Sequence, residues 1–446
     1  MFEVLADRTY RHLFAAQVIA LLGTGLATVA LGLLAYDLAG ANAGAVLGMA
    51  LMIKMVAYIG VGPVVNAFVD RLPRRAFLVS MDLVRAAVAL LLPFIDQIWQ
   101  VYLLIFVLQS ASAAFTPTFQ ATIPDILPEE RRYTRALSLS RLAYDMESLV
   151  SPMLAAALLT VISFHWLFAG TVIGFLASAA LVVSVVIPQP KALAARGGIY
   201  DRTTRGSRIY LKTPRLRGLL ALNLAAAAAG AMVIVNTVVY VRNVLGRPEN
   251  DVAIALAAFG GGSMIAALAL PRLLEKRSDR QVMLTAAGVL LAGLLAMAVL
   301  TTAPGVDRWI SLLCVWAVLG VGYSAVLTPS GRLLRRSAAP EDRSALFAAQ
   351  FALSHACWLV TYGVAGAFGA AAGMPAALLV LAGLTLVGLL TAIVVWRKAD
   401  PDALDHAHPE LDPGHPHLQA HAAASARHAH DFVIDDLHTR WPSRET

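Results

Sequence analysis

Histidines concentrate near the C-terminus of this chain. Eight of its 11 histidines follow the last apolar stretch. Three H-x-H pairs occur among them, and in an extended chain residues i and i+2 point to the same side. Imidazole is a good ligand for nickel, cobalt, zinc and copper. The spacing therefore predicts a metal-binding tail that uses His406, His408, His415, His417, His421, His428, His430 and His438. An expression tag is a poor alternative, because tag histidines would be consecutive.

The charge of the same segment agrees with this interpretation. From residue 399 onward, nine Asp and Glu residues face three Arg. The rest of the chain is strongly basic, since the whole carries a formal net charge of +7. A negative, histidine-rich segment beside a positive surface would concentrate divalent cations. Its polar composition predicts disorder over residues 399–446.

A second set of chemically capable residues lies within long apolar stretches. Ionisable groups are costly in a bilayer and are functional by default. Carboxylate, imidazole and thiol groups can all bind a borderline divalent metal. Residues two apart on a helix point about 200° apart, so neighbouring candidates cannot all face one cavity. The candidates for a substrate or proton pathway are Glu147, His355, Asp145, Cys357 and Lys54.

Each candidate also has a structural interpretation. Asp145 lies four residues after Arg141 and can pair with it on one helix face. Glu147 has no partner within one turn, so it must face another helix, a cavity or a substrate. Lys54 can supply its counter-charge. A lone histidine or cysteine in an apolar helix, such as His355 or Cys357, is more often a packing residue.

Hydrophobic residues make up 59% of the chain and charged residues 14%, with a mean hydropathy of +0.70. Soluble domains carry about 25% charge. The apolar stretches are continuous rather than alternating, which excludes a β-barrel. Each is long enough to cross a bilayer as a helix. We therefore predict an all-α membrane protein with twelve transmembrane helices, at residues 13–36, 43–69, 77–94, 98–119, 137–163, 166–187, 216–241, 252–271, 282–302, 309–328, 345–372 and 376–396.

Lys and Arg occur mainly in alternate loops, which predicts that these loops and both termini face the cytoplasm. The positive net charge thus reflects membrane topology, and no nucleic-acid partner is expected. No cleavable signal peptide is expected either, because polar residues fill the first positions and no small-residue cleavage site follows. Cys314 and Cys357 both lie in apolar stretches, so a disulfide framework is not indicated.

The chain repeats itself at a shift of 212 residues. Thr116-Pro117 recurs as Thr328-Pro329, and residues 128–131 (PEER) recur as residues 340–343 (PEDR). Two parallel six-helix repeats of this kind place a substrate site between them, near the bilayer midplane. The expected units are residues 1–187, a cytoplasmic linker at 188–215 with a short surface helix, residues 216–398, and the tail at 399–446.

The loop between the second and third expected spans carries a motif, N-A-F-V-D-R-L-P-R-R-A-F-L at residues 66–78. It resembles the G-x-L-a-D-r-x-G-r-r-x-x-l signature of the major facilitator superfamily, with Asn66 and Pro73 in place of two glycines. The resemblance implies the twelve-helix major facilitator fold. It also implies a gating loop, which here is Asp70, Arg71, Arg74 and Arg75. Arg74 and Arg75 could equally serve as topology determinants.

Asp82-x-x-Arg85 and the stretch from Pro117 to Pro152 are similar to the siderophore- and macrolide-exporter branch of that family. That branch includes bacterial nickel-resistance permeases with histidine-rich C-termini. The resemblance implies a monomeric inner-membrane exporter of nickel or cobalt that exchanges metal for protons and needs no cofactor. Two alternatives remain open: an exporter of a macrolide or siderophore, and a non-transporting membrane metal receptor. No Walker loop or enzyme motif is visible, so an enzyme is not expected.

Overall fold

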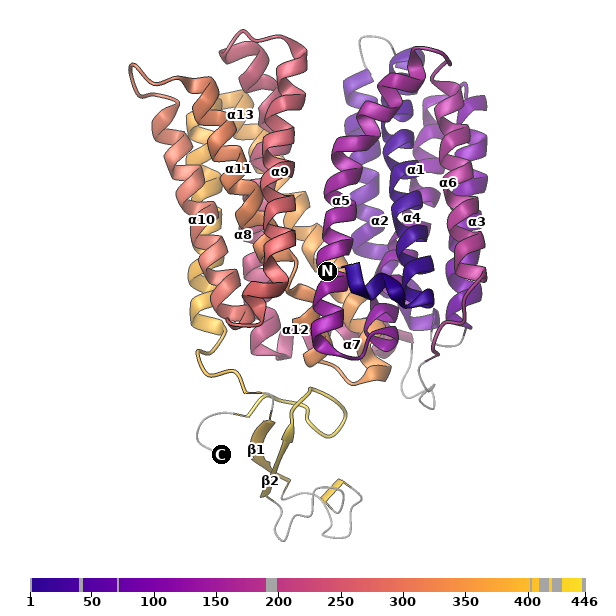
Figure 1. Ribbon diagram of the computed structural model, residues 1–446, viewed down its shortest axis with the longest axis vertical. Coiled ribbons are helices and arrows are strands. Elements are labelled where there is room, and N and C mark those ends of the chain that lie inside the picture. Colours follow the sequence, from indigo (N-terminus) through magenta and orange to yellow (C-terminus); the bar gives the residue numbers. More distant parts are fainter. Residues whose placement is uncertain are drawn as a thin grey trace.

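A computed structural model describes residues 2–39, 43–69, 72–189, 199–401, 403–408, 417–418 and 427–442. Figure 1 shows a helical body with a small strand pair below it. The α-helices of the first part are α1 (Arg8–Ala39), α2 (Ala43–Val69), α3 (Arg74–Leu91), α4 (Ile98–Ile126), α5 (Glu130–Leu159), α6 (His165–Val183) and α7 (Ile199–Lys212). Those of the second part are α8 (Pro214–Val239), α9 (Glu249–Leu274), α10 (Asp279–Leu300), α11 (Arg308–Leu327), α12 (Ser330–Arg336) and α13 (Arg343–Val395). Short turns of 3₁₀-helix, η1 (Phe2–Ala6), η3 (Leu92–Phe94) and η5 (Pro340–Asp342), and the π-helical η4 (Tyr240–Val244) complete the helical elements.

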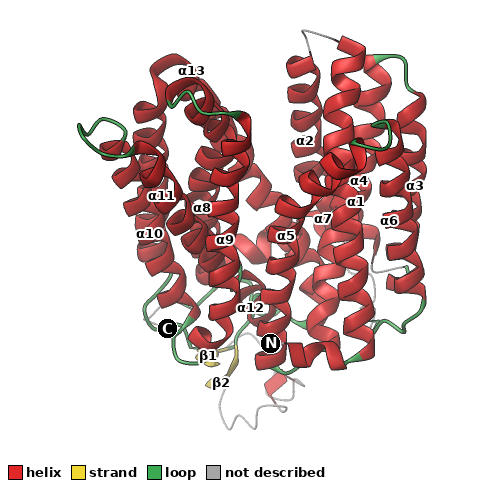
Figure 2. Cartoon of the chain, turned by 45° about the horizontal axis from the view of Figure 1, so that its top comes forward, coloured by secondary structure: helices red, strands yellow, loops and turns green. Residues whose placement is uncertain are grey.

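The long helices form two groups that stand side by side (Figures 1 and 2). We call α1–α6 the N bundle and α8–α13 the C bundle. In the N bundle, α6 packs against α1 and α3, and α4 packs against α2 and α3. In the C bundle, α13 packs against α8 and α10, and α11 packs against α9 and α10. The same pairing in both groups is the structural counterpart of the 212-residue sequence repeat.

Ten helical segments in the described residues are long and apolar enough to cross a bilayer. Two of these lie in α13, whose 53 residues are broken at Gly373, where φ is 78° and Pro375 follows. Helices α2 and α5, with 27 and 30 residues, occupy the two remaining positions of the pattern. Helix α5 is less apolar because it carries Arg141, Asp145 and Glu147. The all-α membrane fold predicted from the sequence is confirmed.

Small residues allow α9 and α11 to pack closely. A Cβ atom placed on Gly262 would lie 1.9 Å from the Ala317 carbonyl oxygen, and one on Gly320 would lie 1.9 Å from that of Phe259. Lipid provides no hydrophobic drive between helices, so such close approach supplies the packing energy. This contact fixes α9, which faces α5 of the N bundle.

Polar side chains set where several helices begin. Asp307 accepts hydrogen bonds from the backbone N–H groups of Trp309 and Ile310 at the start of α11. Ser278 accepts one from Gln281 at the start of α10. These side chains satisfy amide groups that have no partner within the helix. Ser278 and Asp307 therefore fix the residues at which α10 and α11 begin.

The helix expected between the two halves is α7. It packs against α13 and α2, and thus contacts both bundles. Tyr210 is buried and donates a hydrogen bond from its hydroxyl to Oε1 of Gln350, 2.5 Å away. Tyr200 on the same helix is exposed. Helix α7 lies at the end of the molecule that carries the arginine-rich loops, which we call the basic end (Figure 1).

Within its described residues, the tail contains two strands, which the prediction of disorder over residues 399–446 did not include. Strands β1 (Ala403–Ala407) and β2 (Arg427–Asp431) pair in antiparallel register, with His406 opposite His428. The strand pair lies beyond the basic end (Figure 1). Phe432 and Ile434, which follow β2, are buried and join the apolar core of the C bundle. The prediction of disorder weighed polar composition and overlooked these apolar anchors.

Candidate functional site

A cavity of about 470 Å³ lies between the two bundles. Its lining comes from α1, α2, α4, α5 and Arg85 of α3 on one side and from α11, α12 and α13 on the other. Three of the five predicted pathway residues line it, namely Lys54, Glu147 and His355. Asp145 and Cys357 are not among the lining residues. Asp145 is two residues from Glu147, and Cys357 is two residues from His355. Side chains at this spacing point to different sides of a helix, so only one residue of each pair lines the cavity.

His355 of α13 is held in one orientation. Its Nδ1 lies 2.7 Å from the Phe351 carbonyl oxygen, so Nδ1–H donates and Nε2 remains the acceptor. The ring meets the Tyr58 ring edge to face, with centroids 4.6 Å apart. Lys54 Nζ lies 5.5 Å from the centroid of the same Tyr58 ring. The contact joins α2 to α13, so His355 belongs to a contact between the bundles.

Glu147 of α5 is the one carboxylate among the residues that line this cavity. A Cβ atom on Gly25 of α1 would lie 3.2 Å from its Oε1. Within the described residues, the Glu147 carboxylate makes no ion pair and accepts no hydrogen bond. The direct Lys54 salt bridge that we considered is therefore not formed, although both residues line one cavity. The carboxylate is available to a ligand.

Asp145 serves a different purpose. Its Oδ1 accepts a 2.5 Å hydrogen bond from Arg141 Nη2, and its Oδ2 accepts one of 2.7 Å from the Ser263 hydroxyl. Ser263 is on α9, so the group joins the two bundles. The Arg141 guanidinium also lies 4.7 Å from the Tyr323 ring centroid. The expected pair of Arg141 and Asp145 is present, and its partners on α9 and α11 were missed.

Cys357 and the Asp82–Arg85 pair take structural positions. Cys357 Sγ lies 4.0 Å from the Leu220 carbonyl oxygen, in the packing between α8 and α13. Asp82 is fully buried and pairs with Arg85, while Ser178 donates a 2.8 Å hydrogen bond to its other oxygen. The Arg85 guanidinium lies between the Phe115 and Phe175 rings. A paired, hydrogen-bonded ion pair of this kind fixes the inside of a bundle.

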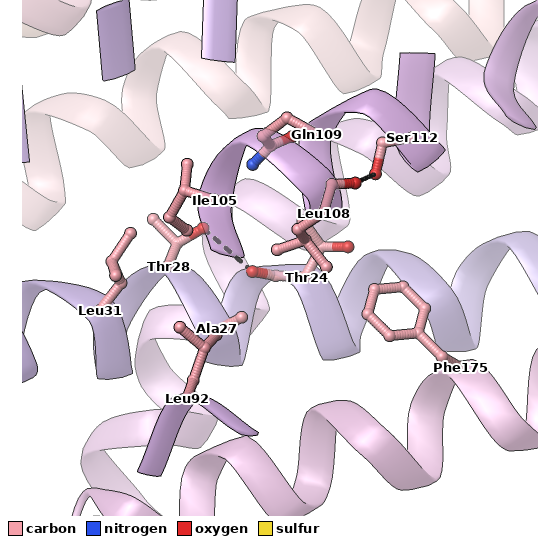
Figure 3. A pocket seen from close by; sticks show the side chains of 10 residues that line it. All are labelled: Thr24, Ala27, Thr28, Leu31, Leu92, Ile105, Leu108, Gln109, Ser112 and Phe175. Atoms are coloured by element: carbon pink, nitrogen blue, oxygen red, sulfur yellow. Dashed lines mark hydrogen bonds between the residues drawn. The ribbon is translucent and has the colours of Figure 1, made fainter. Parts of the chain in front are cut away.

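A small side pocket of about 30 Å³ extends the central cavity into the N bundle (Figure 3). Thr24, Thr28 and Ser112 line both spaces. The hydroxyls of Thr28 and Ser112 donate to the carbonyl oxygens of Thr24 and Leu108 on their own helices. The volume suffices for a water molecule. A mostly apolar pocket with a few hydroxyl groups therefore lies between α1 and α4 beside the cavity.

Ion pairs close the cavity at the basic end. Arg74 of α3 is buried and donates to Asp125 of α4 at 2.7 Å. Arg343 of α13 donates to the other oxygen of Asp125 at 2.6 Å. Arg74 also donates to the Ser344 hydroxyl at 3.2 Å. We call Arg74, Asp125 and Arg343 the basic-end bridge, because it ties the N bundle to the C bundle.

Of the four predicted gating residues, Arg74 lies within this bridge and Arg75 is exposed. Asp70 and Arg71 lie outside the described residues. A second bridge involves the loop between α9 and α10, where Arg131 donates to Glu275 at 2.8 Å. Arg332 joins Glu130 at 2.5 Å and Asp279 at 3.1 Å. The basic end is thus held by charges from both repeats.

The tail histidines form a cluster. Six of the eight predicted ligands lie in the described residues, and His415 and His421 lie outside them. Two overlapping groups have ligand atoms within 4.8 Å of one another: His406, His408, His417 and His438, and His406, His417, His428 and His430. The hairpin register brings together residues that are far apart in sequence. Four histidines at this spacing can bind one transition-metal ion.

The electrostatics of the cluster favour metal binding. Burial, and then the neighbouring imidazoles, lower the pKa of His406 and of His417 to about 4. Both rings are therefore neutral at pH 7 and present a lone pair. Asp435 Oδ1 lies 2.8 Å from His438 Nδ1 and orients that ring. This carboxylate was not among the predicted site residues, although its position three residues before His438 was a usable signal.

These features define a class of protein. Two bundles of apolar helices long enough to span a membrane enclose a cavity with polar lining residues, and ion pairs join the bundles at the basic end. This is the architecture of a secondary membrane transporter.

The comparisons with known proteins agree. The model of the Major Facilitator Superfamily matches residues 13–306 and 219–430, and the chain belongs to that family. It is a multi-pass membrane transporter and not an enzyme.

The relatives differ in how much they match. Macrolide efflux protein A of Streptococcus pyogenes is 26% identical over 182 residues, which are 40% of this chain and 44% of that protein. The chain thus matches less than half the length of this relative. A bacterial homologue of the iron transporter ferroportin, in an outward-facing state, has a TM-score of 0.74 at 13% identity, covering 86% of this chain and 98% of that one. The human organic anion transporter MFSD10 has a TM-score of 0.72 at 12% identity, covering 86% and 99%. These two likenesses concern the fold.

Proposed function

We propose that this transporter exports a divalent transition metal, with nickel the first choice and cobalt the second. The observation that carries the proposal is the convergence of six tail histidines into groups of four whose ligand atoms lie within 4.8 Å of one another. A macrolide exporter has no need for such a cluster. Imidazole is a strong ligand for late first-row divalent ions. The choice of nickel over zinc rests on the sequence resemblance and not on ligand chemistry.

The transport path runs through the central cavity. Glu147 and His355 line it from opposite bundles, where Glu147 presents its carboxylate and His355 presents Nε2. A divalent ion held between a carboxylate and a neutral imidazole satisfies the ligand preferences of nickel. Lys54 in the same cavity balances the Glu147 charge when no ion is present. Protons compete with metal for these ligands, so inward proton movement can drive metal release outside.

The basic end faces the cytoplasm in this proposal, following the positive-inside rule. The described arrangement is then closed towards the cytoplasm by the basic-end bridge. Metal enters when Arg343 and Asp125 separate, and it leaves from the arrangement seen here. The histidine tail would lie in the cytoplasm, where it collects the ion before transport. The protein acts as a monomer in this scheme, because both ligands come from one chain.

The second candidate is the export of an organic compound such as a macrolide. Two observations favour it: the name of the relative in Streptococcus pyogenes, and the apolar part of the cavity lining, which includes Leu21, Ile123, Leu137 and Phe347. Export of a siderophore falls in the same class. A third candidate, a membrane metal receptor that transports nothing, would explain the tail without the cavity.

A sensitivity panel separates these functions. A metal-sensitive bacterial host expressing the chain is grown with Ni²⁺, Co²⁺, Zn²⁺ and a macrolide. We expect growth at raised Ni²⁺ and, to a smaller extent, at raised Co²⁺, with unchanged macrolide tolerance. Macrolide tolerance without metal tolerance would support the second candidate. Metal tolerance that persists in Glu147→Gln would indicate sequestration by the tail and would favour the receptor.

A further inference from the structure

One set of histidines in the tail cluster includes His438, which lies in the segment after β2. His438 Nε2 lies 3.1 Å from His406 Nε2 and 3.2 Å from His408 Nε2. His417 completes the group of four. His406 and His408 come from β1 and the residue that follows it, whereas His438 belongs to the segment after β2, so the group joins the hairpin to residues 432–442. We call His406, His408, His417 and His438 the inner site.

The rings of the inner site are already oriented. His406 Nδ1 lies 2.9 Å from the Leu404 carbonyl oxygen, and His438 Nδ1 lies 2.8 Å from Asp435 Oδ1. Each contact engages one ring nitrogen and leaves Nε2 directed at the cluster. Backbone carbonyls and carboxylates are the usual outer partners of metal-binding histidines. An ion can therefore bind without reorganising these two ligands.

The same segment is attached to the basic end of the C bundle. The Phe432 ring lies between His438 and Trp441, with centroids 4.8 and 5.1 Å away. The Arg215 guanidinium at the start of α8 lies 5.2 Å from the Trp441 ring centroid. Arg397 donates to the Pro442 carbonyl oxygen at 3.4 Å. The inner site is thus part of the docked tail.

One arginine connects the docked tail to the segment that carries Arg343 of the basic-end bridge. Arg205 of α7 donates to Asp436 at 2.9 Å, and Asp436 directly follows the carboxylate that orients His438. The same guanidinium binds Asp342 through both oxygens, at 2.5 and 2.9 Å. Asp342 immediately precedes Arg343, which bonds Asp125 across the bundles. Polar contacts of Arg205 and Arg343, joined by two pairs of residues adjacent in the sequence, therefore link the inner site to the basic-end bridge.

We infer that a divalent ion bound at the inner site holds the basic end closed, through Arg205. The inference rests on the proposed function for the nature of the ion. An ion that binds better to the docked, assembled cluster than to an undocked tail must stabilise every contact that docking requires. Arg205 holds the docked tail and the start of α13 together. By linkage, closing the basic end must in turn strengthen metal binding by the same factor.

The consequence is an ordered cycle. A loaded tail favours the arrangement that releases ions to the far side, and it disfavours reopening towards the cytoplasm. Transfer of the ion out of the inner site then permits the gate to open again. The tail acts as a sensor of the metal as well as a collector.

The test uses the full-length protein in nanodiscs, with Cys314 and Cys357 replaced by Ser and spin labels at Glu129→Cys and Lys276→Cys. Both labelled positions are exposed and flank the basic end on opposite bundles. Ni²⁺ alone is the probe, and its paramagnetism is avoided by repeating the distance measurement with Zn²⁺. All variants carry Glu147→Gln, so that neither transport nor binding at this carboxylate contributes. We expect the ion to raise the ratio of short to long distances by about fivefold or more.

Arg205→Gln should retain ion binding at the tail and lose this shift. Arg208→Gln is the matched control, because Arg208 lies on the same helix and pairs with Asp201 of α7 itself. It should keep both binding and shift. His408→Ala with His438→Ala should lose the shift, because it removes two of the four ligands of the inner site and leaves only the group that contains His428 and His430. An unchanged shift in Arg205→Gln, or no shift in the parent protein despite tail binding, would overturn the inference. Neither readout requires transport, so failure of the proposed function would leave this result interpretable.

Discussion

Asp125 should control the closure of the basic end, and Asp125→Asn tests this. Its carboxylate is the one counter-charge shared by Arg74 at 2.7 Å and Arg343 at 2.6 Å. The side chains of Arg74 and Arg343 are 2% and 16% exposed, so neither guanidinium is well solvated. Asparagine keeps the size of the side chain and removes the charge. Two close arginines would then repel each other in the closed arrangement.

The size of the effect of Asp125→Asn on closure follows from the burial of its ion pairs with Arg74 and Arg343. Truncating one partner of a buried charge pair costs about 2–5 kcal/mol, and part of this cost is relieved when the basic end opens. A net change of about 3 kcal/mol between the two arrangements corresponds to a shift of roughly a hundredfold. The closed arrangement should therefore lose its dominance in Asp125→Asn. Spin labels at Glu129→Cys and Lys276→Cys report the separation of the bundles.

The second bridge provides the control. Arg131 and Glu275 are 60% and 41% exposed, and such surface pairs are worth about 0–1 kcal/mol. Glu275→Gln should therefore change the distance distribution by less than about fivefold. The reasoning would be refuted if Asp125→Asn left the distances of the parent protein unchanged, or if Glu275→Gln opened the basic end more than Asp125→Asn did.

Three further predictions concern other parts of the chain. Removing residues 403–446 should weaken metal tolerance without abolishing it. Asp400 is kept because its carboxylate accepts a 3.1 Å hydrogen bond from Trp396. Complete loss of metal tolerance at normal protein levels would place the tail in the transport path. GFP fused after Thr446 should fluoresce in a bacterial host, whereas a dark but well-expressed fusion would reverse the orientation. Asp145→Asn should lower thermal stability by about 2–5 kcal/mol, and Ser263→Ala by about 1 kcal/mol; equal losses in thermal unfolding would argue against a buried ion pair.

The membrane fold could be predicted from the sequence because hydrophobicity alone determines which segments enter a bilayer. The break within α13 illustrates the limit of that signal. Residues 345–396 read as two apolar runs, and Gly373 with a φ of 78° is the local cause of the turn between them. Helix α5 was expected to begin at residue 137 and begins at Glu130. Its first turns are charged, and hydropathy cannot distinguish a polar helical extension from a loop.

Individual residues of the candidate site could be predicted from the sequence, but their arrangement in space could not. Glu147 and His355 were singled out by their cost in a bilayer, and only the structure places them on one cavity. Ser263, Tyr58 and Asp125 gave no signal, because a serine, a tyrosine and an aspartate near a helix end are ordinary in such positions. They gain meaning from partners on another bundle. Contacts of this kind depend on tertiary packing, which local patterns do not encode.

In the tail, the chemistry of the residues was predicted but their structure was not. Its histidines were recognised from their H-x-H spacing, and an extended tether seemed sufficient to present them. The structure adds a strand pair that sets His406 opposite His428, and an apolar anchor at Phe432. Pairing across the hairpin brings four ligands together where the sequence offers two at a time. The predicted chemistry stands as a proposal, now with a defined geometry.

The central claim is that Glu147 carries a divalent ion through the cavity. Its most direct test is Ni²⁺ transport in proteoliposomes, measured with the protein lacking residues 403–446 so that tail binding cannot contribute. An indicator inside the vesicles should report Ni²⁺ movement with the parent protein under a proton gradient. Glu147→Gln, incorporated to the same level and folded equally well, should reduce that rate at least about a hundredfold, a loss of roughly 2.7 kcal/mol in transition-state stabilisation. Undiminished Ni²⁺ transport by Glu147→Gln would contradict the account.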